Sequence, residues 1–243
     1  MRILRSEWLK LVSVPTTWLL LGTMLLIEGL AAGLLTGLAD IEDLKGRNPA
    51  SLLTGTGLAT VMIFTLGALL ATNEYRHGTA NHTFIITPRR ERVVLAKLAV
   101  GLVVGIAAAL LYVTVNAGLG LSILSSRDVP VDGDLAVNVY LGTGTGIVLG
   151  CLFGVALGVL LRNQILTIVV GLVLFLLRGV VALFIGTSVG KYFPGEALLA
   201  LQGTPGAAAT LLDQVDAGFV LLATCVVLSI AGMVVTRFRE ITG

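Results

Sequence analysis

Charged residues are scarce in this sequence, and their scarcity excludes a soluble domain. Only 12% of the 243 residues are Asp, Glu, Lys or Arg, whereas a typical soluble domain has about 25%. The mean hydropathy is +0.99. Most of the 30 glycines lie inside apolar runs, as is common in packed transmembrane helices. The sequence therefore predicts an all-α, polytopic membrane protein with a single domain over residues 1–243.

Residues that bind metals and nucleotides are also rare. Cys151 and Cys225 each lie within an apolar run, so we expect neither a disulfide nor a metal site. The phosphate-binding pattern G-x-x-x-x-G-K-[ST] is missing. The predicted cytoplasmic segments total only about 50 residues, too few for a catalytic domain. We therefore expect a chain that is not an enzyme, binds no cofactor itself and has no nucleic-acid partner.

Six apolar windows are long enough to cross a bilayer, which takes roughly 20 residues. Basic residues orient them by the positive-inside rule. With the N-terminus inside, the inner segments hold eleven Lys and Arg and the outer segments hold four. Both termini are therefore predicted to be cytoplasmic. The windows cover approximately residues 17–39, 51–72, 97–124, 138–161, 164–187 and 217–236.

The first 16 residues predict an amphipathic helix on the membrane surface. Leu4, Trp8 and Leu11 recur at helical spacing, while Arg5 and Lys10 face elsewhere. A proline then separates this helix from the first window. The alternative is a basic flank that only sets the topology.

The segment 73–96 follows the second window and combines apolar with basic side chains. Phe84, Ile85 and Ile86 form an apolar group, and Pro88 and several arginines follow. Contact with anionic lipid would explain the arginines but not the apolar group. We therefore expect this segment to dock on another protein.

Three stretches, SEWLKL, EYRHGT and TPRRERVVLAK, resemble the permease subunits of ABC-2 type transporters. In that family a short elbow helix precedes six spans, and a coupling helix after the second span docks on an ATPase subunit. The resemblance implies that residues 1–16 form the elbow helix, and its ATPase-coupling pattern matches Glu74, Tyr75, Arg76, Gly78, Thr79, Pro88, Arg89 and Lys97. From the loop itself we add Phe84, Ile85, Ile86 and Arg90 to the expected ATPase-coupling residues, and we expect Glu74 to tie the loop to Arg5 or Lys10.

The resemblance also implies a function and partners. The chain would be the permease subunit of an ATP-driven exporter in the bacterial plasma membrane. A functional unit would contain two ABC ATPase subunits, which bind ATP and Mg, and a second, identical permease protomer. The apolar spans and the lack of a large outer domain indicate a lipophilic or amphipathic cargo, such as a drug, a peptide antibiotic or a lipid.

A further stretch, KYFPGEALLAL at residues 191–201, is similar to the Tyr-Leu-Pro segment that carries short re-entrant helices in the family. Phe193 stands where Leu is commoner. We expect a re-entrant outer hairpin over residues 188–212, between the fifth and sixth spans. Tyr192, Phe193 and Pro194 would then form part of an outer gate.

Glycines recur every fourth residue in the fourth window, from Gly142 to Gly158, and again at Gly29, Gly33 and Gly37 in the first. Such a row lets another helix approach closely. The partner helix could belong to a second protomer, as a seam or a sliding face, or to the same protomer. For the fourth window we favour packing within one protomer.

Glu28 and Arg178 are charges inside the first and fifth windows, where each costs at least roughly 2.5–3.5 kcal/mol. They could form a salt bridge across the protomer seam, line the path of an amphipathic substrate, or make separate local hydrogen bonds.

Two other functions of the protein stay open. One is a secondary transporter or channel that uses both charges without an ATPase, and the other is a membrane scaffold that transports nothing.

Overall fold

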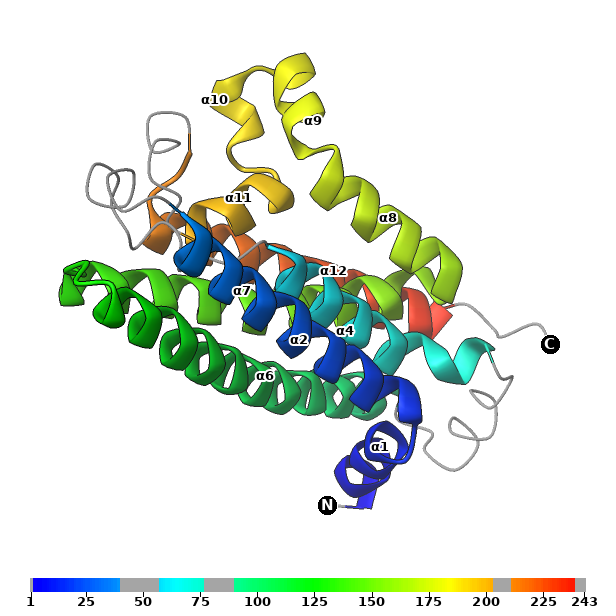
Figure 1. The fold of residues 1–243 in the computed structure, drawn as a ribbon. Coiled ribbons are helices and arrows are strands. Elements are labelled where there is room, and N and C mark those ends of the chain that lie inside the picture. Colours follow the sequence, from blue (N-terminus) through cyan, green and yellow to red (C-terminus); the bar gives the residue numbers. More distant parts are fainter. Residues whose placement is uncertain (1, 40–56, 77–89, 203–210, 239–243) are drawn as a thin grey trace.

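The computed structural model describes residues 2–39, 57–76, 90–202 and 211–238. Every regular element in these residues is a helix (Figure 1), which confirms the all-α prediction. In chain order the helices are α1 (Arg2–Val12), α2 (Pro15–Leu38), α4 (Leu58–Arg76), α6 (Arg90–Ser126), α7 (Gly133–Leu161), α8 (Gln164–Leu176), α9 (Arg178–Ile185), α10 (Thr187–Gly190), α11 (Pro194–Leu201) and α12 (Gln214–Phe238).

Five of these helices are long and apolar enough to cross a membrane, namely α2, α4, α6, α7 and α12. They correspond to the predicted windows except the fifth. Helix α4 continues to Arg76 and α6 begins at Arg90, so both ends of the segment predicted as a loop, 73–96, are helical. Glu, Arg and Lys favour a helix nearly as well as apolar residues do. Hydropathy therefore marks the end of a span but not the end of its helix.

The fifth predicted window is divided in the structure. Helix α8 has 13 residues and ends before Leu177, where φ is −92° and ψ is 11°, and α9 begins at Arg178. At 1.5 Å per residue α8 is about 20 Å long, too short for a hydrocarbon core of about 30 Å. The fifth window, 164–187, is therefore built from two helices, and the break falls at Arg178 and Gly179 within an otherwise apolar sequence.

Two short helices, α10 and α11, fall in the region predicted as the outer hairpin. Helix α11 begins at Pro194, where the fixed φ of proline suits the first helical position. It packs against α7, α8 and α12, and most of its residues are buried. Its re-entrant course in a membrane stays a prediction.

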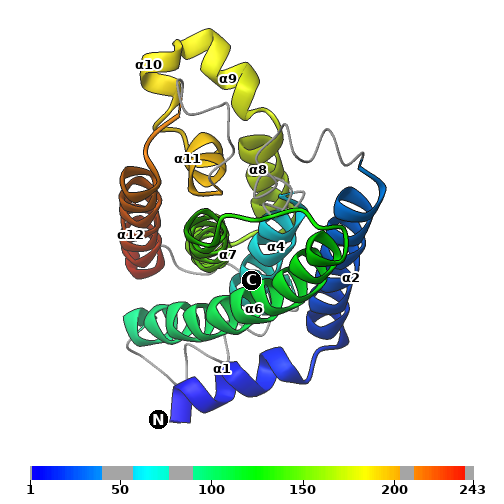
Figure 2. The same ribbon diagram turned by 60° about the vertical axis from the view of Figure 1, so that its left-hand side comes forward.

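Helix α7 lies at the centre of the bundle, with α4, α6 and α12 packed around it (Figure 2). A Cβ atom added at Gly154 would lie 2.1 Å from the carbonyl oxygen of Phe64 in α4. A Cβ atom at Gly67 of α4 would lie 2.2 Å from the carbonyl oxygen of Cys151 in α7. The two helices therefore touch backbone to backbone. The glycine row of the fourth window serves packing within one protomer.

The first glycine row differs, because a Cβ atom at Gly33 or Gly37 of α2 would meet no atom within 4 Å. A contact of this row with a second protomer stays a prediction.

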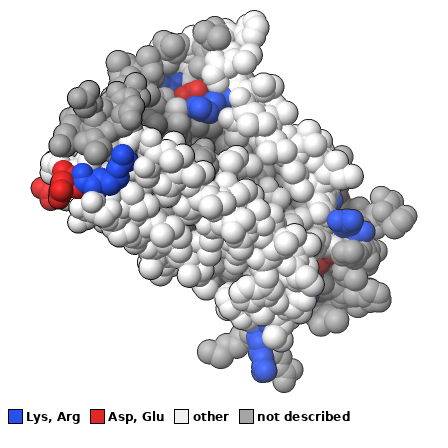
Figure 3. Space-filling model, in the orientation of Figure 1, with Lys and Arg blue, Asp and Glu red and all other residues white. Residues whose placement is uncertain are grey.

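Figure 3 shows charged residues at the ends of the visible face and a broad uncharged surface between them. Leucines on the long helices are exposed there and elsewhere, with Leu26 at 63% and Leu110 at 64%. Such a surface suits a lipid bilayer rather than water.

An aromatic cluster holds α8 against this core. The ring centroids of Phe64 in α4, Phe153 in α7 and Phe175 in α8 lie between 5.1 and 6.0 Å apart. Edge and tilted contacts at these distances add to the apolar burial. A Cβ atom at Gly171 of α8 would lie 1.9 Å from the Phe64 ring, so the glycine lets α8 approach. The second half of α8 therefore packs closely against α4.

We predict that Gly154→Ala destabilises the protein and that Gly146→Ala, in the same helix, does not. A methyl group at Gly154 would overlap the Phe64 carbonyl oxygen, and such overpacking costs about 1–3 kcal/mol. A Cβ atom at Gly146 would meet its nearest atom at 3.8 Å, an ordinary contact, and alanine is the better helix former. Thermal unfolding in one detergent measures both. Equal melting temperatures would contradict the backbone contact.

Candidate functional site

Helix α1 turns a carboxylate toward the bundle and apolar side chains outward. Glu7 is 2% exposed, whereas Leu4 and Trp8 are 45% and 41% exposed. Leu11 is partly buried against the apolar core. The helix predicted for this segment is therefore present. Its exposed Leu and Trp suit a membrane surface, but contact with lipid stays a prediction.

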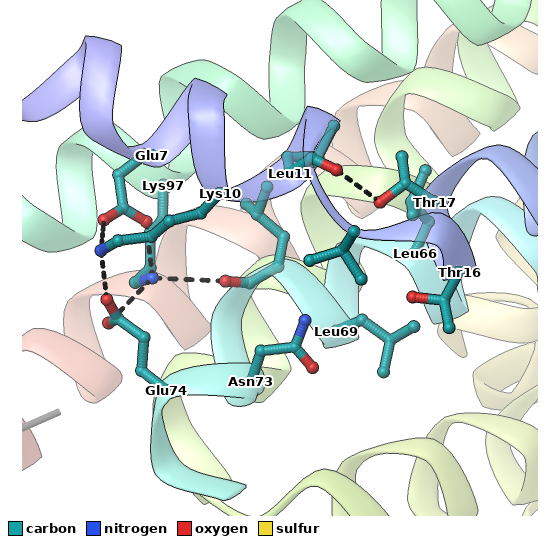
Figure 4. A pocket seen from close by; sticks show the side chains of 12 residues that line it. Glu7, Lys10, Leu11, Thr16, Thr17, Leu66, Leu69, Asn73, Glu74 and Lys97 are labelled. Atoms are coloured by element: carbon teal, nitrogen blue, oxygen red, sulfur yellow. Dashed lines mark hydrogen bonds and ion pairs between the residues drawn. The ribbon is translucent and has the colours of Figure 1, made fainter. Parts of the chain in front are cut away.

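Four charged side chains meet where α1 crosses the ends of α4 and α6 (Figure 4). We call Glu7, Lys10, Glu74 and Lys97 the charge cluster. Lys97 Nζ lies 2.7 Å from Glu7 Oε2 and 3.1 Å from Glu74 Oε2. Lys10 Nζ lies 2.7 Å from Glu7 Oε1 and also pairs with Glu74 Oε1. Each carboxylate oxygen therefore contacts one ammonium group, and each ammonium group contacts both carboxylates.

Lys97 is the most demanding member of the cluster, because it is only 4% exposed. Besides its two carboxylate partners, its ammonium group donates to the carbonyl oxygen of Leu70 at 3.3 Å. An ammonium group has three hydrogens, so three acceptors match its capacity. A buried charge is tolerated only when it is paired and hydrogen-bonded in this way. The cluster therefore explains how a lysine is accommodated beside a long apolar run.

Lys10 is the exposed member of the cluster, with 46% of its side chain accessible. Burial lowers the pKa of the Lys10 ammonium group, but hydrogen bonds and charges from Glu7 and Glu74 more than offset this, so its pKa is raised above the ordinary value. A raised lysine pKa contributes stability that is present at neutral pH and is lost only above that pKa. Lys10 therefore stays charged throughout the physiological range.

Hydrogen bonds fix the turn that joins α1 to α2. Thr17 Oγ1 donates to the carbonyl oxygen of Leu11 at 2.8 Å, and Trp18 Nε1 donates to that of Val12 at 2.9 Å. Pro15 is the first residue of α2. These bonds satisfy carbonyl groups that the end of a helix leaves open. The two bonds therefore tie the start of α2 to the end of α1.

A small cavity lies beside the charge cluster, among side chains of α1, α4 and the start of α2 (Figure 4). Its volume is about 40 Å³, close to the roughly 30 Å³ that one water molecule occupies in the liquid. The cluster itself is a contact between α1, α4 and α6.

The structure places the flanks of the predicted coupling loop. Glu74 contacts Lys10, one of the two partners expected from the sequence. Arg76 instead donates to Gln164 Oε1 of α8 at 3.4 Å, and Arg90 is the first residue of α6. Tyr75, beside Glu74, is half-buried. Seven predicted residues lie outside the described residues, namely Gly78, Thr79, Phe84, Ile85, Ile86, Pro88 and Arg89.

Glu28 and Arg178 have different partners in the described chain. Glu28 is fully buried, and its Oε1 accepts from the backbone N–H of Ala59 at 2.9 Å. A carboxylate at the start of α4 is favoured by the exposed N–H groups and the helix dipole. Arg178 lies 4.0 Å from Glu196 of α11. This arrangement corresponds to local bonding, and a salt bridge across a protomer seam stays a prediction.

The predicted gate residues lie between α10 and α11. Tyr192 is 52% exposed, and the ammonium group of Lys191 lies 5.2 Å from its ring centroid. Phe193 is the N-cap residue of α11, and Pro194 is its first residue. Their role in a gate stays a prediction.

The sequence interpretation did not identify Lys97 as a partner of Glu74, or Glu7 as a partner of the two lysines. Two signals could have suggested them. Glu7 and Lys10 are three residues apart and so share one face of a helix. Lys97 borders a long apolar run, where a charge needs an opposite partner. No such signal exists for Glu196, because its contact with Arg178 depends on the break after α8.

The sequence of this chain matches the model of one protein family. A sequence model of the family described as ABC-2 family transporter protein matches residues 3–178, which is more than half of the chain. The matched region contains all four residues of the charge cluster. No curated protein matches the chain.

We predict that Lys97→Met destabilises the protein by about 3–5 kcal/mol, because it leaves buried carboxylates short of a partner. The double variant Glu7→Gln, Lys97→Met restores neutrality and should regain at least about 1 kcal/mol. Arg5→Gln, an exposed change on the same helix, should shift stability by less than about 0.5 kcal/mol. Unfolding in detergent measures all three. A double variant no more stable than Lys97→Met would contradict the cluster.

Proposed function

This chain belongs to the ABC-2 transporter family, and from that membership we propose that it is the permease of an ATP-driven exporter in which the charge cluster carries movement from an ATPase into the spans. Membership makes the chain a membrane permease subunit of an ABC transporter. The export direction, the coupling route and the cargo are the proposal. The contact of Glu74 with Lys10 is the observation that carries the coupling route.

The proposed route starts at residues 77–89, which connect α4 to α6. Their apolar group, Phe84, Ile85 and Ile86, would insert into a groove on the ATPase. Closure of two ATPases on ATP would then displace the flanks of this segment. Glu74 and Lys97 lie on these two flanks, and both hold the same helix, α1. A displacement of either flank therefore moves α1.

The route continues from α1 into α2 through the fixed turn at Pro15. Helices α2 and α4 are then linked at both ends, since α1 is bonded to Glu74 at one end of α4, and Glu28 of α2 caps the other end at Ala59. Two linked helices move as one unit more readily than as separate rods. This supports a joint movement of α1, α2 and the end of α4 that carries Glu74 during transport.

A cavity beside α11 supports a lipophilic or amphipathic cargo. It has a volume of about 220 Å³ and lies among α4, α8 and α11. Apolar side chains such as Phe175 and Leu198 line it, together with the guanidinium group of Arg178 and the amide of Gln202. An apolar wall with a few polar groups is the usual composition of a small-molecule site.

The proposed assembly has two identical permease protomers and two ABC ATPases in the bacterial plasma membrane, with both termini cytoplasmic. ATP and Mg would bind to the ATPases. A transporter or channel that uses Glu28 and Arg178 as an ion relay is less well supported. Glu28 is fully buried against the start of α4, and Arg178 is beside Glu196 instead.

We predict that Phe84→Ala weakens assembly with the ATPase about 30-fold, because a buried apolar anchor often contributes about 2 kcal/mol or more. Arg89→Gln should have a mild effect, since charges at the rim of an interface mainly tune encounter. Co-purification and ATP hydrolysis of the co-expressed pair measure both variants. Normal assembly of Phe84→Ala, or no assembly of the unmodified chain with an ABC ATPase, would contradict the proposal.

A further inference from the structure

A further cavity lies between the end of α4 and the start of α8. These two helix ends lie at the same end of the bundle as α1 (Figure 1). We call this cavity the basic cavity. Its volume is about 350 Å³, within the range of about 300–1,000 Å³ of small-molecule sites. The described residues that line it are Tyr75, Arg76, Arg162, Asn163, Gln164, Ile165 and Ile168.

The basic cavity carries positive charge from two directions. Arg76 comes from the last turn of α4, and Arg162 comes from the turn between α7 and α8. None of the described lining residues is acidic. Arg76 also donates to Gln164 Oε1 at 3.4 Å, which holds its guanidinium group near the start of α8. Two arginines that line one cavity favour an anion with several oxygen atoms, such as a phosphate.

Arg162 occupies a backbone position that normally favours glycine. It ends α7 in the left-handed conformation, with φ 54° and ψ 18°, and its N–H donates to the carbonyl oxygen of Gly158. A side chain in this conformation costs energy that glycine avoids. The chain therefore keeps an arginine where the backbone alone would prefer none.

The outer wall of the basic cavity is apolar and faces away from the protein. Ile165 is 76% exposed, and Ile168 also lines the cavity. Val169, one turn further along α8, is 49% exposed. A small free anion would make no use of such a wall. An acyl chain would lie along it while its headgroup occupied the basic cavity.

We propose that the basic cavity binds the phosphate headgroup of an anionic membrane phospholipid, with its acyl chains along α8. The predicted orientation places this end of the bundle at the cytoplasmic leaflet, where anionic lipids attract basic side chains. This site goes beyond the transport proposal and does not depend on it. The shared chemistry is a phosphate, and the apolar wall selects a lipid over free phosphate.

The test is thermal unfolding of the purified full chain, stripped of lipid, as short-chain phosphatidylglycerol is added. The anionic lipid should raise the melting temperature, because a ligand that binds the folded state stabilises it. Short-chain phosphatidylcholine and inorganic phosphate should raise it less. Arg162→Gly and Arg76→Gln should each lower the apparent affinity for phosphatidylglycerol at least about fivefold more than Arg5→Gln, which removes a charge outside the cavity.

Arg162→Gly keeps the test informative if arginine variants fold poorly, because glycine suits the left-handed backbone position and the lipid response of each variant is measured against its own melting temperature without lipid. An equal response to phosphatidylcholine would overturn the proposal, because the headgroup charge would then be irrelevant. An equal response to inorganic phosphate would also overturn it, in favour of a free-anion site. If either cavity variant binds phosphatidylglycerol with an affinity within twofold of that of Arg5→Gln, the residue changed in that variant does not belong to the site.

Discussion

Lys97 places a positive charge inside a bundle of apolar helices, and the arrangement at this end of the molecule follows from the need to satisfy it. Three acceptors surround its ammonium group, from α1 and from two positions in α4. Removing any of them would leave buried charge without its partner, which is far more costly than losing an exposed salt bridge. Helix α1 is therefore joined to α4 and α6 by a chemical requirement and not only by apolar contact.

The glycine contacts and the charge cluster divide the protein into parts with different mechanical roles. Helix α7 touches α4 backbone to backbone near its centre, at Gly154 and Gly67, where little relative movement is possible. At the end of α4, long side chains replace these close contacts. Ion pairs between flexible side chains can follow a displacement that close backbone packing cannot. This end of α4 is therefore suited to receive movement.

The sequence was sufficient to predict what depends on composition and local pattern. Hydropathy placed α2, α4, α6, α7 and α12, and three short motifs indicated the family. The break after α8 was not predicted, because the sequence is apolar on both sides of it and the Arg178-Gly179 pair at the break also occurs within unbroken membrane helices. The partners of Glu28, Glu74 and Arg178 also depend on which helices pack together. Pairing of buried charges is a tertiary property, and only the contact of Glu74 with α1 could be anticipated, from the place of Glu74 at the end of the second window.

Hydrogen exchange of α1 tests most directly whether the charge cluster holds it. Helix α1 has 11 residues, and an isolated helix of that length is marginal in water. Its amide protection should therefore depend on the cluster. In Lys97→Met, the account predicts that α1 amides exchange at least about tenfold faster while those of α7 keep their protection. Unchanged protection of α1 in this variant would show that other contacts hold the helix and would contradict the account.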